Sequence, residues 1–113
     1  MHEAGFAHSD VKLDNIMINN KGEFKLIDFG TLTDLSLLKD GKTTEKKGTF
    51  TYMCPNLLKN YTEKPTEYQP VQADMFALGV TLILLKFGEF PFDYAQNSDK
   101  QYMNIIGREN IRN

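Results

Sequence analysis

The sequence predicts a mainly α-helical domain with one small β-hairpin, and three observations lead to this fold class. An apolar run from Met75 to Leu85 is typical of a core helix. Residues 15–27 place two short apolar stretches around a polar turn, which is typical of a hairpin. Finally, 113 residues with 41% hydrophobic content are enough for one domain around one core.

The hairpin is predicted from Asn15 to Ile27. Its first strand, Ile16–Ile18, is apolar and mostly β-branched, and its second strand, Phe24–Leu26, alternates apolar and charged residues. The residues between them, Asn19–Gly22, tolerate the positive φ angles of a tight turn. We expect this hairpin to bring Asp28, which follows the second strand, beside Asn15.

Two polar stretches predict loops. The first, Thr31–Lys47, is rich in threonine and contains a turn signal at Asp40–Gly41. Loops of this length inside a compact domain are usually functional or mobile. The second, Lys59–Gln72, contains Pro65 and Pro70 and is predicted to be irregular.

The long helix is predicted from Asp74 to Phe87. Asp74 suits its N-terminus, Gly88 its C-terminal cap, and Pro91 blocks its continuation. Its apolar residues cover every face, which predicts a helix buried on all sides. A shorter amphipathic helix is expected around Lys100–Ile106.

Charge and cysteine content indicate the cell compartment and the class of partner, but they do not indicate a reaction. Thirteen basic and fifteen acidic residues argue against nucleic acid or an anionic membrane as the principal partner. The single cysteine, Cys54, cannot form an internal disulfide, and Met1–Gly5 has neither the basic start nor the apolar run of a signal peptide. The run from Met75 to Leu85 is well short of the roughly 20 residues of a membrane-spanning helix. We therefore expect a soluble protein of the cytoplasm or the nucleus.

The strongest chemical signal is the segment from His8 to Asn15, H-S-D-V-K-L-D-N, followed beyond the hairpin by Asp28-Phe29-Gly30. Such segments can place a carboxylate base, an amide oxygen and a second carboxylate around one hard cation and one phosphate, as phosphoryl transfer requires. These motifs resemble the eukaryotic protein kinase family. They match its H-R-D-x-K-x-x-N catalytic loop, except that Ser9 replaces Arg, and they match its D-F-G motif in full.

The resemblance implies a protein kinase-like large-lobe fragment, mainly α with a small hairpin. Residues 1–113 are expected to form one partial kinase domain, from the catalytic loop to the region after the family's long central helix. No G-x-G-x-x-G loop and no Val-Ala-Ile-Lys segment occur in the sequence. The small lobe and the end of the large lobe are therefore expected to be absent.

By this resemblance, four residues would carry the chemistry. Asp10 would be the catalytic base for the substrate hydroxyl, and Lys12 would meet the γ-phosphate of ATP. Asn15 and Asp28 would each offer an oxygen to Mg²⁺. Each of these residues alone reads more simply as a charged or polar residue of a solvated turn. Together, at the family's spacing, they predict an ATP- and Mg²⁺-dependent site.

Three further site residues follow from the same resemblance. Met17 would lie under the adenine ring of ATP, and Ile27 would line the same nucleotide site. Thr49 would bridge Asp10 and Lys12 through its hydroxyl, because Gly48 to Asn56 resembles the end of a kinase activation segment. Taken alone, that segment is an ordinary threonine-rich loop that ends at a proline.

Other residues would support the site. Asp74–Gly79 resembles the family's D-x-W-S-x-G, in which the aspartate accepts hydrogen bonds from backbone N–H groups of the catalytic loop. The simpler interpretation of Asp74 alone is a helix cap. His8 and Phe29 would stack in the family's hydrophobic spine, although each alone is simply a core residue.

Two departures from the family pattern bear on regulation. Ser9 removes the arginine that binds a phosphate on the activation segment, so activity is not expected to depend on loop phosphorylation. Thr43 and Thr44 could still accept phosphate and Glu45 could supply a fixed negative charge, although surface positions are the simpler interpretation. Asn56 replaces the glutamate of the family's Ala-Pro-Glu.

Together these features predict a kinase that transfers phosphate from ATP to Ser or Thr of protein substrates, because Lys12 is typical of Ser/Thr kinases. The isolated chain is expected to be inactive, and a small lobe or a partner protein is expected over an apolar face at Met17, Ile27 and Phe29. Two alternatives stay open: a pseudokinase-like protein-interaction module, which Ser9 and Asn56 favour, and a truncated gene product without function.

Overall fold

A computed structural model describes residues 1–96 and 98–105 of the chain. The two long helices are α1 (Pro55–Thr62) and α2 (Pro70–Phe87). The strands are β1 (Phe6–Ala7), β2 (Ile16–Ile18), β3 (Phe24–Leu26) and β4 (Thr33–Asp34). Single turns of 3₁₀ helix are η1 (His2–Ala4), η2 (Leu13–Asn15), η3 (Leu35–Leu37) and η4 (Phe50–Tyr52).

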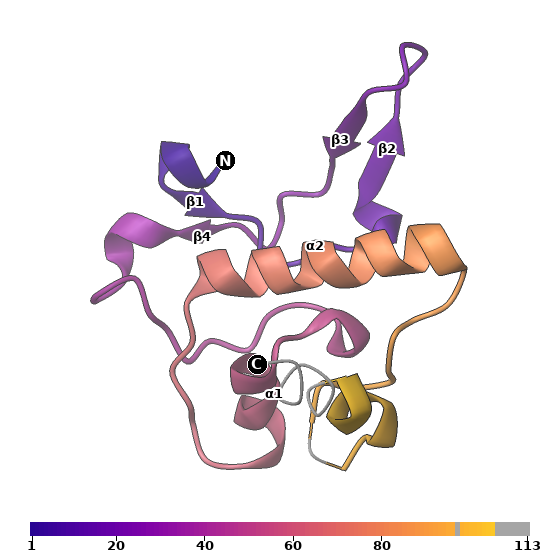
Figure 1. Cartoon of the computed structure of the whole chain (residues 1–113). Helices are drawn as coiled ribbons and strands as arrows, with labels where there is room; N and C mark the ends of the chain where they lie inside the picture. Colours follow the sequence, from indigo (N-terminus) through magenta and orange to yellow (C-terminus); the bar gives the residue numbers. More distant parts are fainter. Residues whose placement is uncertain (97, 106–113) are drawn as a thin grey trace, which may run out of the picture.

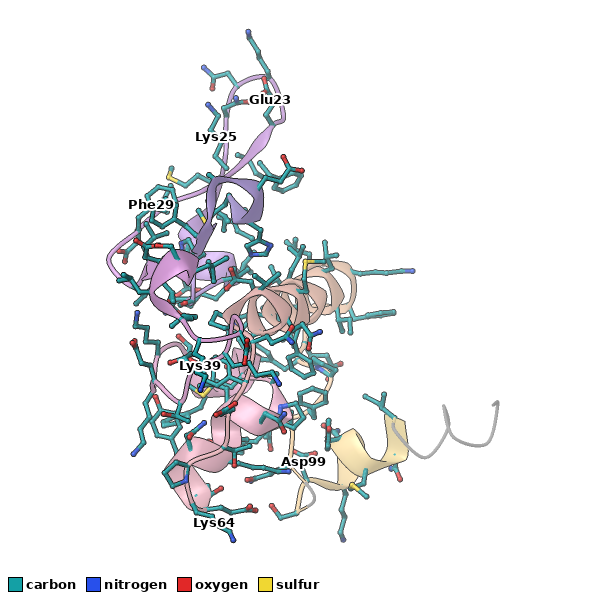
Figure 2. All side chains as sticks on the ribbon, turned by 90° about the vertical axis from the view of Figure 1, so that its left-hand side faces the viewer. Glu23, Lys25, Phe29, Lys39, Lys64 and Asp99 are labelled. Carbon is teal, nitrogen blue, oxygen red and sulfur yellow. The ribbon has the colours of Figure 1, made fainter. Side chains whose placement is uncertain are left out.

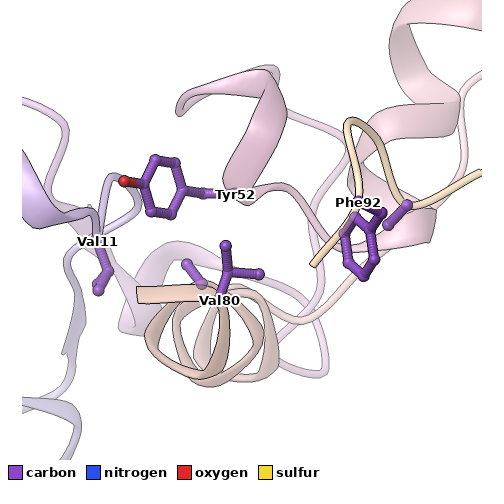
Figure 3. Close-up of a cluster of buried hydrophobic side chains, with 6 residues drawn as sticks. Val11, Tyr52, Val80 and Phe92 are labelled. Carbon is purple, nitrogen blue, oxygen red and sulfur yellow. The ribbon is translucent and has the colours of Figure 1, made fainter. Parts of the chain in front are cut away.

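Helix α2 crosses the middle of the molecule (Figure 1). The strands lie on one side of it, and α1 and the helical residues 100–105 lie on the other. One buried cluster joins the loop after β1 to α2 and the segment that follows it (Figure 3); it consists of Val11, Tyr52, Ala77, Val80, Phe92 and Ala95. A second cluster forms around α1 from Met53, Leu57, Leu58, Tyr68 and Ala73.

The predicted hairpin is confirmed. β2 and β3 pair antiparallel, with Ile16 opposite Leu26 and Ile18 opposite Phe24. The side chain of Asn19 closes the turn by accepting hydrogen bonds from the backbone N–H groups of Lys21 and Glu23, both at 2.9 Å. The hairpin extends away from the rest of the molecule, so its two faces have few neighbours (Figure 1).

The predicted start of the long helix is wrong. α2 begins at Pro70, one turn before Asp74, because proline at the first helical position has a suitable fixed φ and lacks only an N–H group that would be unpaired there. Asp74 is therefore inside the helix and is not its cap. The C-terminal cap is as predicted: Gly88 has φ 77° and its N–H donates to the carbonyl of Leu84 at 2.8 Å.

The polar stretch 59–72 is less irregular than predicted. Its first residues belong to α1, which begins with a proline at Pro55, and its last residues begin α2. The buried side chain of Asn60, in α1, binds both backbone groups of Thr66 in the connection between the helices, donating to its carbonyl at 2.8 Å and accepting from its N–H at 2.9 Å. These hydrogen bonds stabilise the connection between α1 and α2, which has no helix or strand of its own.

The prediction that the long helix is buried on all sides is also wrong. Ala77, Val80 and Thr81 are buried, but Met75 and Leu82 are each 57% exposed. Only one side of α2 packs against the described residues, although its sequence is apolar on all sides. By length and composition alone α2 could cross a membrane, but the core helix of a soluble protein passes the same test.

The predicted loop 31–47 is mostly irregular, but it contains η3 and the short strand β4, which pairs antiparallel with β1. The predicted turn at Asp40–Gly41 is confirmed, since both residues have positive φ and Lys42 N–H donates to the carbonyl of Lys39. The predicted C-terminal helix is present over residues 100–105, and Ile106 lies outside the described residues.

Candidate active site

Asp74 holds the loop that carries Asp10. Its carboxylate is 5% exposed and accepts the backbone N–H of His8 at 2.7 Å and that of Ser9 at 2.9 Å. These are the contacts that the sequence predicted for this aspartate. Ser9 has φ 70°, a left-handed conformation that a residue with a side chain seldom adopts. The two hydrogen bonds to a buried carboxylate stabilise this turn and so fix the backbone just before Asp10.

Asp10, Thr49 and Lys12 meet at one point. The hydroxyl of Thr49 donates to Oδ1 of Asp10 at 2.9 Å and accepts a hydrogen bond from Nζ of Lys12 at 3.1 Å. Nζ of Lys12 also lies 3.8 Å from Oδ2 of Asp10. The predicted threonine bridge is therefore present. It holds a carboxylate and an ammonium group side by side in a partly exposed position.

The hairpin brings Asn15 and Asp28 together as expected. The backbone N–H of Ile27 donates to the carbonyl of Asn15 at 2.8 Å, which places Asp28 next to the buried Asn15. The amide nitrogen of Asn15 donates to the backbone carbonyl of Asp10 at 2.9 Å. Asp28 is exposed, and its carboxylate accepts only the N–H of Gly30, at 3.3 Å, among the described contacts.

An amide oxygen and a carboxylate are hard donors, so Asn15 and Asp28 fit a Mg²⁺ ion by their chemistry. Within residues 1–96 and 98–105, no group of three or more His, Cys, Asp or Glu side chains is placed to hold a metal ion. A cation held by Asn15 and Asp28 would therefore take its other ligands from phosphate or water, as Mg²⁺ commonly does.

The proposed nucleotide side of the site is open. Met17, on β2, is 57% exposed, and Phe29 is 52% exposed. Ile27, which directly follows β3, is partly buried. His8 is fully buried, and one ring nitrogen lies 2.9 Å from the carbonyl of Ile27. The rings of His8 and Phe29 meet edge to face at 5.6 Å, as the sequence predicted. His8 thus connects the end of the hairpin to the Asp10 loop.

Comparison with known proteins decides the family. Residues 1–113 match the family model described as "Protein kinase domain". The chain belongs to the protein kinase domain family. It is 35% identical over 109 residues to serine/threonine-protein kinase MRCK gamma of Homo sapiens, covering 96% of this chain and 7% of that protein. It is 32% identical over 120 residues to serine/threonine-protein kinase ppk8 of Schizosaccharomyces pombe, covering 100% of this chain and 22% of that protein.

A third relative is serine/threonine-protein kinase Genghis Khan of Drosophila melanogaster, 31% identical over 115 residues, with 100% of this chain and 7% of that protein covered. The chain thus spans less than a quarter of the length of each of these three relatives. All three bear the name of a serine/threonine kinase.

Several residues that hold this part of the kinase domain were not predicted. The hydroxyl of Thr31 donates to the carbonyl of His8 at 2.9 Å, and the hydroxyl of Thr33 lies 2.6 Å from that of Ser9. Lys47 donates to the hydroxyl of Thr33 at 3.1 Å. The threonine-rich composition of the loop was the available signal, but it indicated a loop and not which hydroxyls turn inward.

The segment with the candidate phosphorylation sites is joined to the chain before α2. Thr43 and Tyr68 exchange both backbone hydrogen bonds at 3.0 Å. The hydroxyl of Tyr68 donates to the carbonyl of Glu45 at 2.6 Å, and burial raises the pKa of Tyr68 to about 12. Tyr68 therefore remains a neutral donor at physiological pH. Thr44 is exposed, and Asn56 lies exposed in the first turn of α1.

Proposed function

We propose that the chain forms the central part of the large lobe of a serine/threonine protein kinase domain, and that the intact protein transfers phosphate from ATP to Ser or Thr of protein substrates. The observation that carries this proposal is the Asp10–Thr49–Lys12 arrangement, in which one hydroxyl bonds both charged groups. The three serine/threonine kinases similar to the chain support the same activity and acceptor.

In this proposal Asp10 orients the substrate hydroxyl and accepts its proton. Oδ1 of Asp10 accepts the Thr49 hydroxyl at 2.9 Å, whereas among the described contacts Oδ2 accepts only the longer hydrogen bond from the Asn15 amide at 3.5 Å, so Oδ2 would be the oxygen that faces the acceptor. Lys12 lies 3.8 Å from that oxygen and supplies positive charge to the phosphoryl group. A positioned base of this kind contributes about 10²–10⁴-fold in rate.

Asn15 and Asp28 would hold Mg²⁺, and Met17 and Ile27 would offer apolar surface to the adenine ring. The bound ion supplies charge neutralisation at the phosphates. Asn15 keeps its amide oxygen available because its amide nitrogen is committed to the Asp10 carbonyl. In the intact protein, a small lobe or a partner would cover the exposed side of β2 and Phe29.

We also propose that activity does not require phosphorylation of the loop. At the position where the family has arginine, this chain has Ser9, whose hydroxyl carries no charge and lies 2.6 Å from the hydroxyl of Thr33. Thr43 is held through its backbone by Tyr68 without a phosphate. Replacing both candidate acceptors, Thr43→Ala with Thr44→Ala, is expected to leave turnover nearly unchanged.

The test uses the full-length protein, radiolabelled ATP and a Ser/Thr peptide substrate. Asp10→Asn should lower turnover about 100-fold or more and leave ATP binding nearly unchanged, because its carboxylate acts on the acceptor. Asp28→Asn should weaken Mg²⁺-dependent ATP binding, measured by calorimetry, as well as turnover. Asp14→Asn removes an exposed carboxylate of the same loop and is the control that should change neither quantity.

If Asp10→Asn and Asp28→Asn both behave like Asp14→Asn, the catalytic proposal fails and the interaction module becomes the better explanation. The 113-residue chain alone should show no turnover above background, since positioning and electrostatic clamping of the phosphates provide nearly all of the catalysis. Turnover by this chain that disappears in Asp10→Asn would contradict that last expectation.

A further inference from the structure

The contacts around Asp10 form a closed ring. Asp10 binds the hydroxyl of Thr49 at 2.9 Å, and Lys47 precedes Thr49 by two residues. Nζ of Lys47 donates to the hydroxyl of Thr33 at 3.1 Å, and this hydroxyl lies 2.6 Å from the hydroxyl of Ser9. Ser9 is the neighbour of Asp10 in the chain. Two short pieces of backbone and three side-chain contacts therefore form a ring of which the Asp10 carboxylate is one member.

Gly48 shows how tightly this ring is closed. Its φ is 113°, and a Cβ atom built on it would lie 3.1 Å from the carbonyl oxygen of Ser9. Side chains rarely tolerate either condition. The backbone between Lys47 and Thr49 thus passes directly against the backbone of the Asp10 loop, and the position of Lys47 is coupled to that of Ser9.

Three oxygen atoms lie close to the ammonium group of Lys47. Nζ of Lys47 donates to the Thr33 hydroxyl at 3.1 Å and to the Thr31 carbonyl at 3.4 Å, and it forms an ion pair with the Glu45 carboxylate at 3.1 Å. The side chain of Lys47 is 27% exposed. Thr31 itself donates to the carbonyl of His8 at 2.9 Å, so a second contact of Lys47 also leads to the Asp10 loop.

We propose that Lys47 is a positioning residue for Asp10. It fastens the segment Lys47–Thr49 to Thr33 and thereby fixes where the Thr49 hydroxyl meets the Asp10 carboxylate. Lys47 itself does not touch the reacting groups. This inference rests on the proposed function for the role of Asp10 in catalysis, but the ring itself can be tested without any activity.

The first experiment compares amide ¹H–¹⁵N spectra of the 113-residue chain and its variants. Lys47→Met should shift the signals of Ser9, Asp10 and Thr33, and Lys47→Arg should restore most of these shifts because it keeps the charge and the donors. Lys46→Met is the matched control: Lys46 is the adjacent lysine, and its described contact is with the Tyr61 ring at 5.5 Å. It should leave those three signals in place.

The second experiment measures kinetics of the full-length protein. Lys47→Met should lower kcat about ten-fold for a peptide substrate, because small misplacements of a catalytic group are costly. The KM for ATP should stay within about two-fold, since none of the contacts of Lys47 involves Met17, Asn15 or Asp28. Lys47→Arg should recover most of kcat, and Lys46→Met should not change it.

Thr33→Val provides a second way to open the ring without removing a charge. It should shift the Ser9 and Asp10 signals as Lys47→Met does, and the double variant should add little to either change, since both break one contact path. The proposal is overturned if Lys47→Met matches Lys46→Met in spectra and kinetics, or if Lys47→Met and Thr33→Val add fully. If Asp10→Asn leaves turnover unchanged, the proposed function fails, while the spectra still decide whether the ring exists.

Discussion

Two residues of the candidate site have backbone angles that residues with side chains seldom adopt. Ser9 has φ 70° and Asp28 has φ 60°. Such conformations cost on the order of 1 kcal/mol or more each, and they persist where the surrounding structure enforces them. At Ser9 the enforcing group is Asp74, whose buried carboxylate accepts the consecutive backbone N–H groups of His8 and Ser9. The strained backbone of Ser9 and the hydrogen bonds to Asp74 that stabilise it thus lie one residue before the candidate base, Asp10.

Asp74 should therefore be among the most important residues for stability. Asp74→Ala should lower the free energy of unfolding by roughly 3 kcal/mol, because it leaves the N–H groups of His8 and Ser9 without their acceptors. Asp74→Asn should cost less, since one oxygen remains to accept one of the two. Urea unfolding followed by circular dichroism measures both.

The control for this pair is Gln72→Ala, an exposed position on the same helix. It should change the free energy of unfolding by less than about 0.5 kcal/mol. Equal losses in Asp74→Ala and Gln72→Ala would show that Asp74 serves only as an ordinary helix residue.

At the residue scale, the sequence predicted those side chains that belong to short, dense motifs. The motifs indicate Asp10, Lys12 and Thr49, and the structure brings Asp10 and Lys12 within hydrogen-bond distance of Thr49, although their catalytic roles remain predictions. No motif indicates Thr33 or Lys47. Each is a common residue in a polar loop, and only the folded path of that loop shows that their side chains turn toward Ser9.

At the scale of elements, the sequence predicts those that depend on neighbouring residues better than those that depend on tertiary contacts. The hairpin was predicted correctly because its strands, turn and register all follow from neighbouring residues. Helices α1 and α2 both begin with proline, and the sequence alone does not distinguish a proline that starts a helix from one that interrupts a loop. The β1–β4 pair is too short to have a pattern of its own, and tertiary contacts produce it.

The bridge between the loop 43–45 and Tyr68 gives an element-scale prediction with a defined pH dependence. The pKa of Tyr68 rises from the ordinary value of 10.0 to about 12 because the ring is buried. Between these values the folded chain keeps the proton while the unfolded chain loses it, so stability falls as pH rises. Below pH 10 the contribution is fully present.

Tyr68→Phe should lose the hydrogen bond to the Glu45 carbonyl and about 1 kcal/mol of stability at pH 7. The difference between the wild-type chain and Tyr68→Phe should then shrink as pH is raised from 10 toward 12, in thermal unfolding experiments. Tyr94→Phe, at an exposed tyrosine, is the control for general effects of alkaline pH. A difference that stays constant over this range would mean that Tyr68 is not held as a neutral donor.

At the scale of the whole molecule, charged residues lie at both ends and an apolar surface is exposed between the hairpin and α2. Glu23 and Lys25 mark the tip of the hairpin, far from Lys64 and Asp99 at the opposite end (Figure 2). Between the hairpin, the N-terminal turn and α2 lies an open groove of about 270 Å³. Its apolar lining includes Val11, Ile16, Phe24, Leu26, Met75 and Leu78. The exposed residues Leu82 and Leu85 follow Leu78 at spacings of four and seven residues, so they extend this surface along α2.

An exposed apolar surface of this kind favours association, because joining two such surfaces removes both from water. We expect the 113-residue chain to form dimers or larger species at concentrations of about 100 μM, as measured by light scattering and sedimentation velocity. The double variant Met75→Lys, Leu82→Lys should shift the population toward monomer, since both side chains are 57% exposed and charge there opposes contact. The variant Gln72→Lys, which adds charge at a polar exposed position of the same helix, should leave the distribution of species unchanged. A wild-type chain that stays monomeric and binds no hydrophobic dye would show that this face does not drive association.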